Sequence, residues 1–174
     1  MRVSTALVAL VGLSLLGCKT LKDVSIGYAD AITTSQLPEA DSWERVEVQF
    51  PSLNDVDPLA SPSLTRYAIT PEQVEAVTLT GVEFEGSDGA CGTPFSSVEI
   101  QLVAAELGPT TLATATRGGE CLDWQLAPAA DLGPWFRQPK VSIVALVDGQ
   151  PPEQVQSLSL HVSFLIDVAD QRIE

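Results

Sequence analysis

The feature that most constrains the fold is a strict alternation of apolar and polar residues in short segments along most of the chain. Residues 46–50 and 98–105 show it clearly, and residues 158–166 carry Leu, Leu, Val, Phe and Ile at every second position. A period of two residues is typical of β-strands with one buried face. Further segments of this kind lie at 76–84, 110–116, 121–126 and 141–147.

The spacing of these segments indicates the fold class. They recur roughly every 10 to 15 residues and are bounded by Gly, Pro and Asp. No segment of helical period is long enough to serve as the crossover that parallel strands require. The sequence therefore predicts an all-β, antiparallel β-sandwich of about seven or eight strands, with short helical turns only. An immunoglobulin-like and a jelly-roll strand order both fit this pattern.

Residues 70–73, Thr-Pro-Glu-Gln, have the form of a helix start. The β-branched residues that follow predict a single helical turn that leads into a strand. In that strand Thr78 and Thr80 are expected to share the inner face with Phe84, and Gly81 is expected at a bulge or bend.

The N-terminus has the pattern of an export signal. Arg2 precedes an almost wholly apolar run over residues 6–16, which is too short to span a bilayer and ends at Gly17 and Cys18. The tetrapeptide Leu15-Leu16-Gly17-Cys18 resembles the lipobox of bacterial lipoproteins, although Leu16 is bulkier than the small residue usual there. The resemblance covers these first eighteen residues only, and an ordinary secretory signal is the alternative.

The resemblance implies that the signal is cut before Cys18 and that this cysteine is acylated. Two or more acyl chains give stable membrane anchoring. Lys19 stands where an aspartate would retain such a lipoprotein at the inner membrane, so the resemblance implies the bacterial outer membrane and leaves open which face. The expected organisation is a signal peptide at 1–17, a lipidated N-terminus and tether at 18–42, and the β-sandwich at 43–174. Alternation within 23–32 leaves open a first strand inside the tether.

The charge balance excludes one class of partner. The chain has 9 basic and 23 acidic side chains and a net charge of −14. Such a field repels phosphate backbones and anionic head groups, so nucleic acid is not an expected partner. Contact with the membrane is therefore expected through the lipid rather than through surface charge.

Cys91 and Cys121 remain as a pair once Cys18 is assigned to lipid. Both are close to glycines, and an exported chain reaches an oxidising compartment, which favours a disulfide between them. Two unpaired thiols are the alternative. A zinc site is disfavoured because two thiols and one distant histidine do not supply the usual ligand set.

Catalytic and cofactor-binding signatures are absent from the sequence, so no catalytic residue, metal site or cofactor is predicted. The single histidine, His161, lies on the polar face of a strand. Carboxylates cluster at 54–57 and 83–88, where they could offer oxygens to Ca²⁺ but lack the spacing of a dedicated calcium loop.

Trp135, Phe136 and Arg137 are the candidate binding residues. Two large aromatic residues in a loop either close the end of a sandwich or form an exposed anchor for a partner. The resulting expectation is a non-catalytic binding or structural module, either an accessory subunit or a ligand-binding domain, whose partner is an envelope protein or a glycan. A carbohydrate-active hydrolase that uses loop carboxylates is the alternative.

Overall fold

The computed structural model describes residues 20–34, 37, 39, 41–86, 91, 94–128, 130–151 and 157–172. The predicted signal peptide and the lipidation at Cys18 lie outside these residues. Within the described part of the chain, no helix is long and apolar enough to cross a membrane.

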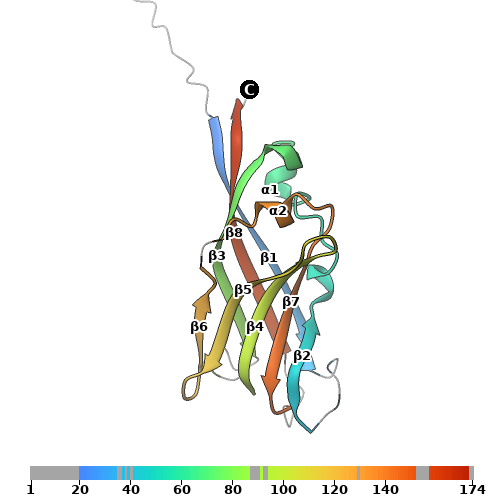
Figure 1. Ribbon diagram of the computed structural model, residues 1–174, viewed down its shortest axis with the longest axis vertical. Helices are drawn as coiled ribbons and strands as arrows, with labels where there is room; N and C mark the ends of the chain where they lie inside the picture. The colour runs from blue at the N-terminus through green and yellow to red at the C-terminus, as the bar shows by residue number, and fades with distance from the viewer. Residues whose placement is uncertain are drawn as a thin grey trace, which may run out of the picture.

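The prediction of an antiparallel β-sandwich is confirmed: the described residues form eight strands in two sheets, and the helices among them are short (Figure 1). The strands are β1 (Thr20–Thr33), β2 (Trp43–Gln49), β3 (Val74–Gly86), β4 (Phe95–Ala104), β5 (Gly108–Arg117), β6 (Leu122–Leu126), β7 (Ser142–Gly149) and β8 (Ser157–Arg172). The helical turns are η2 (Pro51–Leu53), α1 (Pro62–Thr65), η3 (Pro71–Gln73) and α2 (Gly133–Phe136).

The strand order is close to that of a jelly roll. One sheet has the order β1-β8-β3 and the other the order β2-β7-β4-β5-β6. In a jelly roll the first strand pairs with the eighth, the second with the seventh, the third with the sixth and the fourth with the fifth. Here the first, second and fourth of these pairings are present, but β6 pairs with β5 instead of β3. As a result, β3 is an edge strand.

The first strand, which the sequence left open, is present and longer than residues 23–32. β1 pairs with β8 along its length, with Ile26 opposite Phe164. From Ser25 to Ala31 its outward positions are occupied by small residues instead of charged ones, which weakens the alternation in the sequence. One of them, Gly27, lies under His161, because a Cβ atom at this position would be 2.9 Å from the Nε2 atom of the imidazole.

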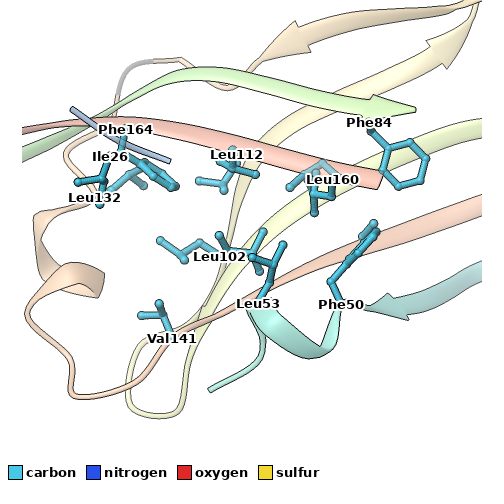
Figure 2. Packing of buried hydrophobic residues seen from close by; sticks show 14 of the residues in the cluster. Ile26, Phe50, Leu53, Phe84, Leu102, Leu112, Leu132, Val141, Leu160 and Phe164 are labelled. Carbon is cyan, nitrogen blue, oxygen red and sulfur yellow. The ribbon is translucent and has the colours of Figure 1, made fainter. Parts of the chain in front are cut away.

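The core lies between the two sheets. Figure 2 shows Phe164 and Leu160 of β8 and Phe84 of β3 pointing from the three-stranded sheet toward the other sheet, to which Leu102 of β4 belongs. All four side chains are buried, and the ring of Phe84 also meets that of Phe50 edge to face, with 6.4 Å between the ring centroids. Burial of each such side chain contributes roughly 1.5–3 kcal/mol to stability.

The register of β3 corrects the predicted faces of this strand. The pairing with β8 shifts between Val74 and Ala76 and again between Leu79 and Gly81, which confirms the bulge expected at Gly81. The expectation that Thr78 and Thr80 share the inner face with Phe84 is wrong, because both threonines are exposed. A bulge adds one residue to the strand and so reverses the faces on one side of it.

The predicted helical turn before β3 is confirmed as η3. The backbone N–H of Thr70 donates to the Oε1 atom of Gln73 at 2.7 Å, which completes a capping box with the Thr70 side chain. This turn directs the chain from the end of the sandwich that carries α1 and α2 into β3 (Figure 1).

Candidate binding site at the open edge of the sandwich

The two sheets end unequally along the side formed by β3 and β6, which we call the open edge. β6 extends the five-stranded sheet beyond β3, so its inner face is covered less and less along the strand. Leu122 is buried, Trp124 is half-buried, and Leu126 is 48% exposed. On the opposite sheet, Leu79 and Val82 of β3 face inward but are only half-buried. Apolar side chains of both sheets are therefore partly exposed along this edge.

One end of the open edge is closed by the segment before α2. The backbone N–H of Val77 donates to Oδ1 of Asp131 at 3.1 Å, and the N–H of Leu132 donates to the carbonyl of Val77 at 2.9 Å. The same Asp131 oxygen accepts the N–H of Gly133 at 2.8 Å. Asp131 therefore joins β3 to the start of α2.

The other end is closed by the disulfide between Cys91 and Cys121, which confirms the predicted pairing. Cys91 lies in the connection between β3 and β4, and Cys121 lies between β5 and β6. The bond thus links the connection between β3 and β4 to the turn between β5 and β6. It provides a covalent connection on the side where the β3–β6 pairing of a jelly roll is missing.

Between these two closures lies an apolar hollow of about 190 Å³, which we call the open-edge cleft. It is lined by Leu79, Thr111, Leu112, Leu126, Ala127, Pro128, Ala130 and Leu132. Thr111 is the one polar side chain among them. An apolar cavity of about 150 Å³ accepts a benzene ring, so the open-edge cleft has the size and chemistry to accept one large apolar side chain.

Four exposed carboxylates lie on the strands and the connection that border the open-edge cleft. Glu83 and Glu85 project from the outer face of β3, Asp123 from β6, and Asp131 from the following connection, and all four are exposed. An apolar hollow with carboxylates around it favours a ligand that combines apolar and positively charged groups.

Trp135, Phe136 and Arg137 lie in and directly after α2, at the end of the sandwich. Phe136 is 1% exposed and meets Phe164 edge to face, with 4.9 Å between the ring centroids. Phe136 is therefore a plug, that is, a buried side chain that closes the end of the sandwich. Trp135 is half-buried and donates its indole N–H to the carbonyl of Gly108 at 3.0 Å.

Arg137 donates from Nη1 to the carbonyl of Val74 at 2.8 Å, so it joins the α2 segment to the start of β3. A binding role for these three residues stays a prediction, and their contacts place them behind the open-edge cleft rather than along its walls.

The carboxylate loop at 54–57 makes local contacts. The Asn54 side chain accepts from the Ser142 hydroxyl at 2.7 Å, and Asp55 lies 3.7 Å from Nζ of Lys140. Asp57 accepts the N–H of Leu59 at 2.9 Å. In the second cluster, Glu83 faces Nδ1 of His161 at 3.6 Å, whereas Asp88 lies outside the described residues. Among the residues with described positions, no three or more His, Cys, Asp or Glu side chains come together as a metal site.

A pair of carboxylates lies across the β1–β8 pairing. Asp23 is directly opposite Asp167, and Glu75 of β3 is close enough to Asp167 to repel its carboxylate. A hydrogen bond with Asp23 that favours the protonated form raises the pKa of Asp167, and burial and repulsion from Asp23 and Glu75 act in the same direction. Because this pKa is higher in the folded protein, ionisation of Asp167 opposes folding at neutral pH.

Asp167→Asn is expected to stabilise the protein at neutral pH, since the amide removes the repulsion. The difference from the wild type should shrink on acidification, as Asp167 becomes protonated below its raised pKa. Urea unfolding at neutral and mildly acidic pH measures this. Glu44→Gln, at an exposed position of β2, controls for the general benefit of removing one negative charge. Equal stabilisation by both variants would contradict the prediction.

Comparison with known proteins returned no match: no family model fits the chain, and no curated protein and no solved structure is significantly similar to it.

Sequence reasoning missed the open-edge cleft. Leu126 reads as an ordinary inward residue of an alternating strand, and Leu79 falls on the face opposite to the predicted face of Phe84. Their partial exposure arises because β6 pairs with β5 and not with β3, and the residue pattern carries no signal for that choice.

Proposed function

We propose that this protein is a lipid-anchored protein of the bacterial outer membrane whose β-sandwich is a non-catalytic binding module. The observation that carries the binding role is the open-edge cleft, an apolar hollow whose wall includes the exposed Leu126. Apolar side chains kept in a concave, partly exposed site are typical of surfaces that bind a partner. The partner class that fits best is another protein of the envelope.

Two observations support the anchor at Cys18. The Cys91–Cys121 disulfide is typical of proteins exported to an oxidising compartment. In addition, β1 starts at Thr20, immediately after the cysteine and its neighbour, and Thr20 pairs with Arg172 of β8. An acylated Cys18 would hold the end of the sandwich with α1 and α2 near the membrane, with the turn between β5 and β6 at the opposite end (Figure 1).

Cys18→Ala is expected to abolish both membrane association and labelling by a clickable palmitate analogue. Two acyl chains give stable anchoring, whereas their loss leaves an acidic domain with no attraction to anionic lipid. The measurement is fractionation of cells that express the full chain, with inner and outer membranes separated on a density gradient.

The matched control is the double variant Cys91→Ser, Cys121→Ser, which retains Cys18 as its one thiol and should remain labelled. A Cys18→Ala protein that still sediments with washed membranes would contradict the lipid anchor. Recovery of the wild type in the inner membrane would contradict the assignment to the outer one.

A further inference from the structure

We infer that the open edge binds an extended polypeptide segment, which adds to β3 as a fourth strand and places an apolar side chain in the open-edge cleft. The segment carries Lys or Arg at the alternate positions that face outward. This inference rests on the proposed binding role and names the chemistry of the partner.

The backbone of β3 supports strand addition. Both the N–H and the C=O of Val77 point away from β8, because they are bonded to Asp131 and Leu132. Backbone groups alternate in direction along a strand, so those of Leu79, two residues later, point to the same side. The Asp131–Leu132 segment thus makes the first contact of a strand on this edge. Among the described residues, no strand pairs with β3 along the remainder of that side.

The position of the cleft supports the same mode of binding. A fourth strand beside β3 would occupy the place of the sixth strand in a jelly roll, and its inward side chains would lie above β5 and β6. Leu112 of β5 and Leu126 of β6 form the floor at that place, and Leu79 of β3 forms a wall. Peptides that bind by strand addition gain affinity from main-chain hydrogen bonds and specificity from pockets for alternate side chains.

Charge selects the kind of segment. Glu83 and Glu85 lie on the outer face of β3, where side chains of an added strand would stand directly opposite them. Opposite charges in cross-strand pairs stabilise a sheet, and like charges destabilise it. A second copy of this chain, paired β3 to β3, would set these glutamates against each other and bring together two chains with a net charge of −14 each. A basic, apolar segment of another protein is therefore the favoured occupant.

The test is a selection of displayed random peptides, about ten residues long to match a typical strand, on the detergent-purified full-length protein. Leu126→Asp is used for counter-selection. Leu107→Asp is the matched control, because Leu107 is 43% exposed at the turn between β4 and β5 and does not line the cleft. Unchanged melting temperatures of both variants verify that they fold.

The expected peptides alternate apolar residues with Lys or Arg. Leu126→Asp should weaken their binding about tenfold or more, equivalent to about 1.4 kcal/mol, whereas Leu107→Asp should have no such effect. If charge attraction alone held the peptide, the new aspartate of Leu126→Asp would strengthen its binding, so a loss of binding points to the apolar contact in the cleft. Synthetic peptides N-methylated at either the odd or the even residues give a second readout. Only one of these two sets of N–H groups would face β3, so methylation of that set alone should abolish binding.

Three results would overturn the inference: no peptide enriched over the Leu126→Asp counter-selection, peptides that bind that variant as tightly as the wild type, or equal binding of both N-methylated sets. A photo-crosslinking amino acid incorporated at position 126 in living cells distinguishes failure of the strand-addition inference from failure of the proposed binding role. A crosslink to a lipid or a glycan would support a binding site at the open edge, but it would contradict the inference that a peptide strand occupies that site. The absence of any adduct at this position would contradict the binding site itself.

Discussion

Replacing Phe136 with alanine is expected to lower the free energy of unfolding by about 3–5 kcal/mol. The ring is 1% exposed, packs edge to face on Phe164 of the central strand β8, and closes the end of the sandwich from α2. Removing it leaves a cavity between elements that cannot collapse freely, because α2 is held to β3 through Asp131 and Arg137. Urea denaturation followed by circular dichroism gives the difference directly.

Phe136→Leu is the control, since it keeps most of the apolar volume and should cost less than about 1.5 kcal/mol. A loss below about 1 kcal/mol for the alanine variant would contradict the role of Phe136 as a plug. Trp135→Ala then decides the role of its neighbour. A clear loss of stability would assign Trp135 to the plug, whereas unchanged stability with lost partner binding would assign it to an anchor.

Removing the disulfide by Cys91→Ser and Cys121→Ser together is expected to cost about 3–4 kcal/mol. The bond closes a loop over a sequence separation of 30 residues, and the chain-entropy model gives this magnitude for a loop of that length. The loss should be concentrated at the open edge, where the bond joins the β3–β4 connection to the β5–β6 hairpin. Hydrogen exchange is therefore expected to accelerate in β6 and to change less at the β1–β8 pairing.

Reductant provides the control for this prediction. Dithiothreitol should lower the stability of the wild type to that of the double serine variant and should leave the variant itself unchanged. A double variant within about 1 kcal/mol of the oxidised wild type would show that the noncovalent contacts of Asp131 and the core suffice to hold the open edge.

Much of the fold follows from periodicity alone. The alternation in residues 46–50, 98–105 and 158–166 indicated strands because one face of each has to be buried, and the capping pattern at 70–73 indicated the turn η3. The errors have local causes. The bulge of β3 between Leu79 and Gly81 put Thr78 on the face opposite to that of Phe84. Gly81 indicated this bulge, but the period-two pattern does not show which residues change face until the pairing is known.

The candidate site was less accessible to sequence reasoning. The even pair Cys91 and Cys121 predicted the disulfide, since the number of cysteines and the pattern of an export signal are both features of the sequence. Trp135 and Phe136 drew attention as large aromatics in a loop, but the burial of Phe136 follows from where α2 sits against β8. Leu79 and Leu126 gave no signal, because each becomes part of a site only when strands distant in the chain end at the same edge.

The sequence by itself therefore determined the class of fold, the positions of most strands and the disulfide, because periodicity, turn residues and cysteine number depend on local chemistry. Only the tertiary structure decided that β6 stays beside β5 and that β3 is left as an edge strand. Strand partners compete through long-range packing, and several orders bury the same alternating residues equally well. The open-edge cleft exists because of that choice of partner.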